Sequence, residues 1–384
     1  MAAPKACSIG KAVPSAVAMT RKGPDIMDVK DKTPKPLNKK SYWGSLLFLA
    51  VLLGITLFMI FKDHSIQEIG GMMKGVKPVF LFIGLGMMFL YVGCEAFSSY
   101  MTMRALKQPV KFRQCCGYSF AGFYFASITP TSSGGQPMQL YYMTRDRMSV
   151  SSSSLTLLLN TIAYQLVLLL YGGIMFLWNG SFLRESVMGV QLLLIYGVAS
   201  NLIMVSLFLA VLFSPKLVGR LVDKLIRLLS RLHILKRPDR ITEKANQQLE
   251  EYARGADYIK QHPLHLLKIL AVCTLQITAL FMVPYWVYRA FGLAGWGPVK
   301  MIAVQAVLTL AVSSLPLPGA VGASENTFVR LFKIFFAADL LLPAMLLCRT
   351  VSFYLFLLIS GGVTAVLQLR RRPATAIKAA GGGV

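Results

Sequence analysis

The sequence has few acidic residues and histidines, and it lacks the spacings that mark a soluble catalytic or metal site. Asp and Glu together number 16, and four histidines are scattered along 384 residues. No HExxH, GxSxG or Gly-Lys-Ser/Thr phosphate-loop pattern occurs. Six cysteines show no CxxC spacing, so neither a zinc site nor a disulfide framework is expected. These absences disfavour a soluble enzyme, and we expect no cofactor and no metal.

Charged residues are also sparse, at 15%, whereas hydrophobic residues make up 55% of the chain. The apolar residues fall in blocks, and a hydrocarbon core about 30 Å thick needs about 20 such residues per helix. We therefore expect an all-α polytopic integral membrane protein. Six full spans are predicted, over residues 43–61, 79–97, 155–178, 190–213, 266–287 and 340–367.

The formal charge of +24 comes from Lys and Arg in the tails and loops beside these blocks. Basic residues at such places keep loops on the cytoplasmic side and attract anionic lipid headgroups. This distribution favours a membrane surface over a nucleic-acid partner. We expect both termini to be cytoplasmic, with a basic disordered tail over residues 1–40 and a second tail over 371–384.

Two apolar segments are interrupted by proline, glycine and hydroxyl residues, within residues 116–143 and 301–336. A full crossing at either place would put basic clusters on the outer side, against the positive-inside bias. We therefore expect two opposed re-entrant hairpins, one in a first membrane half (41–214) and one in a second (265–370). Broken helices at corresponding positions are typical of inverted-repeat transporters, so an inverted repeat is a hypothesis. Arg330 and Lys333 near the outer face count against this topology.

A basic linker over residues 215–264 joins the two halves. Leu217, Leu221 and Leu225 recur at helical spacing among lysines and arginines. This pattern is typical of an amphipathic helix on the inner membrane surface. A helical connector packed on the loops is the alternative.

The first interruption offers polar groups at membrane depth. Gly134 and Gly135 allow backbone donors to approach an anionic headgroup closely. Side-chain hydroxyls and an amide come from Thr129, Thr131, Ser132, Ser133 and Gln136. The alternative is that these residues only cap two half-helices.

The second interruption places a carboxylate next to a sharp turn. Pro318 and Gly319 lie in the turn, and Glu325 follows at the start of the returning half-helix. Glu325 could cap that helix, meet a cationic group of a substrate, or pair with Arg349 in the last span. Glu95, near the inner end of the second span, is a weaker candidate. The charged triplet 145–147 is either a solvated turn or a collector of phosphate.

The motifs SITPTSSGGQPMQ (127–139) and LPLPGAVGASE (315–325) resemble the transmembrane region of the lysylphosphatidylglycerol synthase/flippase (MprF) family. Arg349, followed by Tyr354 and Gly361, is similar to that family's last span, and the resemblance covers residues 41–370. In that family the membrane region is associated with moving aminoacylated phosphatidylglycerol between leaflets, while a soluble domain transfers lysine from lysyl-tRNA. The sequence ends soon after its last span, so we do not expect the soluble domain in it.

The resemblance implies a flippase-like protein of a bacterial cell membrane that translocates phosphatidylglycerol or its lysyl form and contributes to resistance against cationic antimicrobial peptides. Its expected partners are an anionic or lysyl-modified phospholipid, with a separate synthase or a second copy also considered. One alternative is a phosphatidylglycerol lysyltransferase that would need lysyl-tRNA, and another is a membrane binding subunit for a separate synthase. The substrate-binding residues of this hypothesis are Thr129, Ser132, Ser133, Gly134, Gly135, Gln136, Pro318, Gly319, Glu325 and Arg349.

Overall fold

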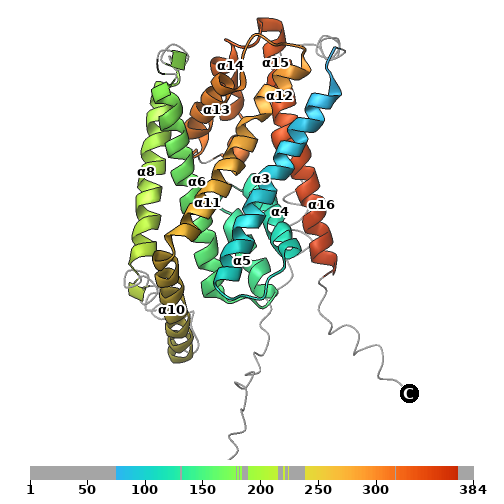
Figure 1. The fold of residues 1–384 in the computed structure, drawn as a ribbon. Helices are drawn as coiled ribbons and strands as arrows, with labels where there is room; N and C mark the ends of the chain where they lie inside the picture. The colour runs from blue at the N-terminus through green and yellow to red at the C-terminus, as the bar shows by residue number, and fades with distance from the viewer. Residues whose placement is uncertain are drawn as a thin grey trace, which may run out of the picture. The chain divides into compact units, whose positions relative to one another are not determined.

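The computed structural model describes residues 75–129, 132–178, 189–214, 238–315 and 317–370, with a few isolated positions between them. The described residues form helices and contain no strand (Figure 1). The predicted span 43–61 and the tails 1–40 and 371–384 lie outside them. The helices are α3 (Pro78–Ala105), α4 (Phe112–Ile128), α5 (Gly135–Arg145), α6 (Val150–Trp178), α8 (Gln191–Phe213), α10 (Pro238–Gln261), α11 (Pro263–Phe281), α12 (Val283–Ala290), α13 (Pro298–Val312), α14 (Ala323–Phe332), α15 (Ala338–Arg349) and α16 (Leu355–Arg370).

Five helical stretches in the described residues are long and apolar enough to cross a membrane. They are α3, α6, α8, the continuous pair α11–α12 (Pro263–Ala290) and the last stretch from α15 into α16 (Ala338–Leu369). Each coincides with a predicted span, so the prediction of an all-α multi-pass membrane protein is confirmed. The sixth predicted span lies outside the described residues, and the count of six stays a prediction.

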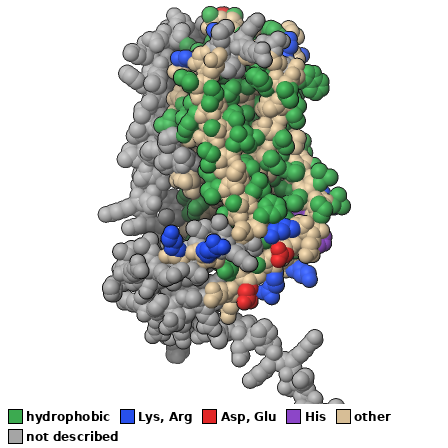
Figure 2. All heavy atoms as spheres, turned by 90° about the vertical axis from the view of Figure 1, so that its left-hand side faces the viewer, with side chains coloured by type: hydrophobic (Ala, Val, Ile, Leu, Met, Phe, Trp, Pro, Cys, Tyr) green, Lys and Arg blue, Asp and Glu red, His purple; other side chains and the backbone are tan. Residues whose placement is uncertain are grey.

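The outward faces of these helices are apolar, as a lipid environment requires. Leu177 and Leu192 are both 85% exposed, and Phe82 is 71% exposed. Figure 2 shows hydrophobic side chains over the middle of one face, with basic and acidic side chains gathered mainly below them. Exposing an apolar surface of this size to water would be unfavourable, whereas in a bilayer the same surface contacts acyl chains.

The two interrupted segments form pairs of short helices. Helices α4 and α5 have 17 and 11 residues, and α13 and α14 have 15 and 10. All four are shorter than the about 20 residues of a full crossing. In Figure 1, α4 and α5 lie in the half of the bundle where α3 ends and α6 begins, and α13 and α14 lie in the other half. Their position relative to a membrane stays a prediction.

The last long stretch is irregular at its centre. Helix α15 contains Pro343, and a π-helical turn, Thr350–Tyr354, joins it to α16. A π-turn widens the helix by one residue and is frequently found at functional sites. Arg349 is the residue immediately before this turn.

Helix α10 occupies part of the predicted linker. Its apolar residues Tyr252, Ala256 and Ile259 pack against Leu155 and Leu212, on α6 and α8. The leucines that suggested an amphipathic surface helix lie outside the described residues. The linker's place on a membrane surface therefore stays a prediction.

Candidate functional site

The two interrupted segments contact each other inside the bundle. Ile128, at the end of α4, is buried in one apolar cluster with Phe353 and Leu357 of the last stretch. Val321, from the turn between α13 and α14, packs against the same cluster, as does Phe125 of α4. Motifs that are far apart in sequence are thus brought together at this point.

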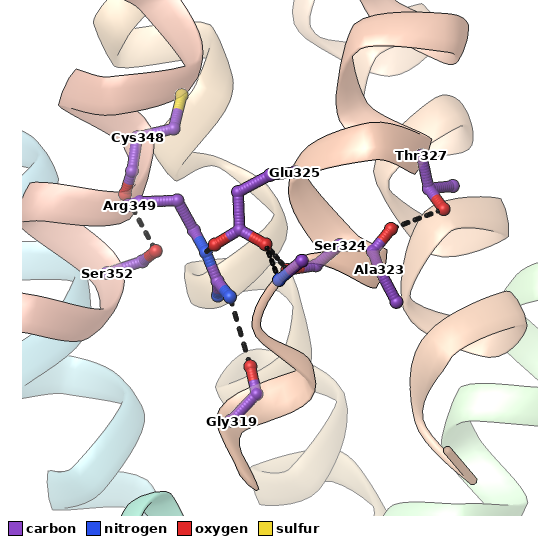
Figure 3. Close-up of polar contacts among 9 residues, drawn as sticks. Gly319, Ala323, Ser324, Glu325, Thr327, Cys348, Arg349 and Ser352 are labelled. Atoms are coloured by element: carbon purple, nitrogen blue, oxygen red, sulfur yellow. Dashed lines mark hydrogen bonds and ion pairs between the residues drawn. The ribbon is translucent and has the colours of Figure 1, made fainter. Parts of the chain in front are cut away.

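An ion pair joins the second interrupted segment to the end of α15 (Figure 3). The Arg349 Nε donates to Glu325 Oε1 at 2.6 Å, and its Nη2 donates to the Gly319 carbonyl oxygen at 3.0 Å. The two charged side chains are 17% and 11% exposed, respectively. Because both side chains are largely removed from water, either charge would be strongly destabilising if its partner were absent. The predicted pairing of Glu325 with Arg349 is therefore what the structure contains.

The same carboxylate also closes the start of α14. Glu325 Oε2 accepts hydrogen bonds from the Gly322 backbone N–H at 2.6 Å and from Ser324 Oγ at 3.0 Å. A glutamate at the third helical position that binds the backbone N–H before the helix satisfies one of the open donors of the first turn. Capping and pairing thus occur together. A contact between Glu325 and a cationic substrate stays a prediction.

The turn that carries Gly319 is packed against an aromatic ring. Gly319 has φ +57°, and a Cβ added there would lie 2.6 Å from Phe353 Cε2. The Arg349 guanidinium carbon lies 4.9 Å from the centre of the same ring, within cation–π range. Gly319 is one of the expected substrate-binding residues, and the space beside it is occupied here by Phe353. Pro318 lies beside it in the short 3-10 turn Pro318–Ala320.

The first interruption is closed mainly by its own residues. Thr129 Oγ1 donates to the Phe125 carbonyl oxygen at 2.7 Å and accepts from the Gly134 N–H at 2.8 Å. A Cβ added at Gly135 would lie 2.9 Å from the Gly122 carbonyl oxygen, so Gly135 lets α5 pack directly on α4. These contacts favour the capping alternative for Thr129 and Gly134.

The remaining predicted residues of this segment take different positions. Ser132 and Ser133 are exposed, and Ser132 has φ +55°. Gln136 donates to Thr161 Oγ1 and so ties α5 to α6. Thr131 lies outside the described residues. The structure therefore brings Gly319, Glu325 and Arg349 into direct contact. From the first segment, Phe125 and Ile128 pack near them, whereas the predicted residues Thr129, Gly134, Gly135 and Gln136 contact their own segment or α6.

The weaker candidate Glu95 and the charged turn 145–147 each have polar partners that the sequence did not indicate. Gln139 on α5 donates to Glu95 Oε1 on α3 at 2.6 Å. Because α3 continues to Ala105, Glu95 lies well within the helix and not near its end. In the charged turn after α5, Asp146 Oδ2 accepts hydrogen bonds from Tyr118 Oη at 2.6 Å and Gln114 Nε2 at 3.1 Å, which ties the turn to α4.

A cavity of about 480 Å³ lies between α14 and the start of α8. Its polar lining includes Asn326, Thr327 and Arg330 of α14. The Arg330 Nε donates to Asn326 Oδ1 at 2.9 Å, and Nη1 donates to the Gly189 carbonyl oxygen at 3.3 Å. The sequence contains the signal, since Arg330 follows Asn326 and Thr327 at helical spacing, but its charge near the outer face by itself indicates only a cost to the topology.

The comparison with protein families agrees with this architecture. The family model described as lysylphosphatidylglycerol synthase TM region matches residues 43–360, which is most of the chain and includes both interruptions and the ion pair. A search of curated proteins found no match. The resemblance seen in the two motifs is confirmed, and the chain belongs to the family of the lysylphosphatidylglycerol synthase transmembrane region.

Proposed function

We propose that this protein is a phospholipid flippase of a bacterial cell membrane that binds and translocates phosphatidylglycerol or its lysyl form. The observation that carries the proposal is the Glu325–Arg349 ion pair, held at the junction of two interrupted helical segments. A charged pair inside a membrane bundle is expensive and is typical of a substrate or ion pathway. Family membership supports a lipid as the substrate.

The proposed topology has the two interrupted segments as re-entrant hairpins from opposite faces. Non-helical backbone is tolerated at membrane depth only where protein or a watery cavity satisfies its polar groups. The N–H of Gly322 and the carbonyl of Gly319 are satisfied in this way by Glu325 and Arg349. With this topology both termini are cytoplasmic, in agreement with the basic tails.

The chemistry of the ion pair matches a headgroup that carries both charges. A guanidinium binds a phosphate through paired N–H donors, and a carboxylate accepts hydrogen bonds from an ammonium group. A lysyl-phosphatidylglycerol headgroup offers both partners, so it exchanges the Glu325–Arg349 contact for two contacts of the same kind. The exposed hydroxyl groups of Ser132 and Ser133 would contact glycerol and phosphate oxygens. The acyl chains would run along the outer surface of the bundle.

Substituting either member of the pair should slow lipid movement. The purified protein would be reconstituted in liposomes with fluorescent phosphatidylglycerol or lysyl-phosphatidylglycerol, and the loss of outer-leaflet label would be followed. We expect protein-dependent movement, slowed about tenfold to a hundredfold by Glu325→Gln or Arg349→Gln, because a hydrogen bond to a charged group contributes about 1.5–3 kcal/mol. Lysyl-phosphatidylglycerol should be affected by both variants, and phosphatidylglycerol chiefly by Arg349→Gln.

Lys260→Gln is the matched control, since it removes one charge from an exposed pair on α10. It should leave the rate unchanged. Binding of lipid without any movement would identify a binding subunit and overturn the flippase. Formation of lysyl-phosphatidylglycerol after expression in a host that lacks this lipid would identify a lysyltransferase instead.

A further inference from the structure

A second carboxylate lies inside the bundle, away from the Glu325–Arg349 pair. Glu95 of α3 is half-buried, between the buried residues Cys94 and Ala96. Its Oε1 accepts a hydrogen bond from Gln139 Nε2 of α5 at 2.6 Å. The Gln139 side chain reaches α3 by passing over Gly122 of α4, where any added Cβ would overlap its amide. The absence of a side chain at Gly122 therefore allows Gln139 to reach Glu95.

Glu95 has no basic partner among the described residues, where the intramembrane ion pair is the one between Arg349 and Glu325. The titratable groups nearest to it are the phenols of Tyr91 and Tyr164 and the thiols of Cys94 and Cys273, all of which are uncharged at neutral pH. They come from α3 itself, from α6 and from α11. The cost of an intramembrane carboxylate is therefore not offset by a cation, and it falls when the group binds a proton.

The first half of α3 packs against α12 and the π-helical turn. Phe80 stacks on Trp286 of α12, and Val351 of the π-turn contacts Gly84. These contacts lie toward the start of α3 and bring no charged group to Glu95. At the level of Glu95, α4 contributes Gly122 and α5 contributes the neutral amide of Gln139.

Gln139 is suited to hold both protonation states of Glu95. It is 5% exposed, and its Oε1 has no hydrogen-bond partner. An ionised carboxylate only accepts hydrogen bonds, and the amide N–H₂ meets that need. A protonated carboxyl group also donates, and a half-turn of the amide would present the unpartnered Oε1 as its acceptor. The orphan oxygen is thus explained as the acceptor of a second state.

The contact also reaches the first interrupted segment. Gln139 and Gln136 both lie on α5, and Gln136 is bound to Thr161 of α6. Helix α5 returns from the turn that follows Ile128, which packs beside Val321 of the second segment. We propose that Glu95 is a proton-binding site, with Gln139 as its switching partner, and that proton uptake there turns the Gln139 amide on α5. The coupling to lipid movement rests on the proposed function, but the proton site does not.

The proton site is tested without any transport measurement. The purified protein in phosphatidylglycerol vesicles would be acidified stepwise and followed by infrared difference spectroscopy, which detects the C=O stretch of a protonated carboxyl group. We expect one such band to be lost in Glu95→Gln and kept in the matched variant Glu325→Gln. Gln139→Leu should keep the band but move it to higher wavenumber, because the acid loses a hydrogen bond. A spectrum unchanged by Glu95→Gln overturns the proposal.

Coupling is tested in the liposome assay by imposing a pH gradient of either direction. Lipid movement by the unmodified protein should depend on the direction of the gradient, and Glu95→Gln should remove that dependence. An equal response in the variant overturns the coupling. If neither protein moves lipid, the proposed function fails, while the infrared result still decides whether Glu95 binds a proton.

Discussion

Replacement of Arg349 by methionine should lower the free energy of unfolding by about 3–5 kcal/mol, since it leaves a buried carboxylate without its cation. Glu325 is 11% exposed and would keep only the Gly322 N–H and the Ser324 hydroxyl as partners. The Gly319 carbonyl would also lose its donor. Unfolding would be measured on the protein in lipid nanodiscs, by heating and following intrinsic fluorescence.

The double variant Glu325→Gln/Arg349→Met separates the unpaired charge from the loss of contacts. It removes both charges, and replacement of a complete buried pair is often close to neutral. The double variant should therefore recover most of the lost stability. Lys260→Met is the surface control: its pair with Asp257 is 27% and 60% exposed, and such pairs contribute about 0–1 kcal/mol. An Arg349→Met variant as stable as Lys260→Met would contradict a buried ion pair.

The membrane spans could be predicted from the sequence because apolar length is a property of the chain alone. Five of the six predicted blocks coincide with apolar helices in the described residues. The ends were less accurate, and α6 is an example. It begins at Val150, before the predicted 155, because Ser151, Ser152 and Ser153 continue the helix and are buried. Hydropathy does not count serine toward a span, whereas here the three serines pack against protein, and Ser152 Oγ accepts a hydrogen bond from Gln108 Nε2 at 3.3 Å.

The ion pair could be foreseen only as one of three alternatives. An arginine within an apolar span needs a partner, and Glu325 was the acidic residue at the opposing break. The choice between capping, pairing and substrate binding depends on how α14 packs against α15, which no local pattern determines. The structure shows that one carboxylate performs the first two roles with its two oxygens.

The glycines illustrate the limit of a sequence argument. A glycine in a break indicates that something approaches the backbone closely, but it does not identify the neighbour. At Gly135 and Gly319 the neighbours are α4 and Phe353. The Glu95–Gln139 contact had no local signal either, since its members lie on different helices. A close approach that excludes a Cβ is visible only once the helices are packed.

Gly319→Ala should destabilise the protein by more than the strain of its positive φ, and the excess would show what occupies the space beside the turn. Both glycines have positive φ, at +57° and +83°, so either alanine incurs backbone strain of about 1–3 kcal/mol. Around Gly322 there is nothing within 4 Å of an added Cβ, whereas at Gly319 the Phe353 ring is in the way. Overpacking of this kind adds about 1–3 kcal/mol.

A second substitution identifies the ring as the cause. Phe353→Leu removes the ring, so Gly319→Ala should cost less in the Phe353→Leu background than in the unmodified protein. The double-mutant cycle would be measured by the same thermal unfolding in nanodiscs, with Gly322→Ala in both backgrounds as the matched control. If Gly319→Ala costs as much in the Phe353→Leu background as in the unmodified protein, the ring is not held against the turn and the space at Gly319 is open to a headgroup. If the cost is large and relieved by Phe353→Leu, then a headgroup that enters beside Arg349 has to displace Phe353 first, and the aromatic ring acts as the gate of the site.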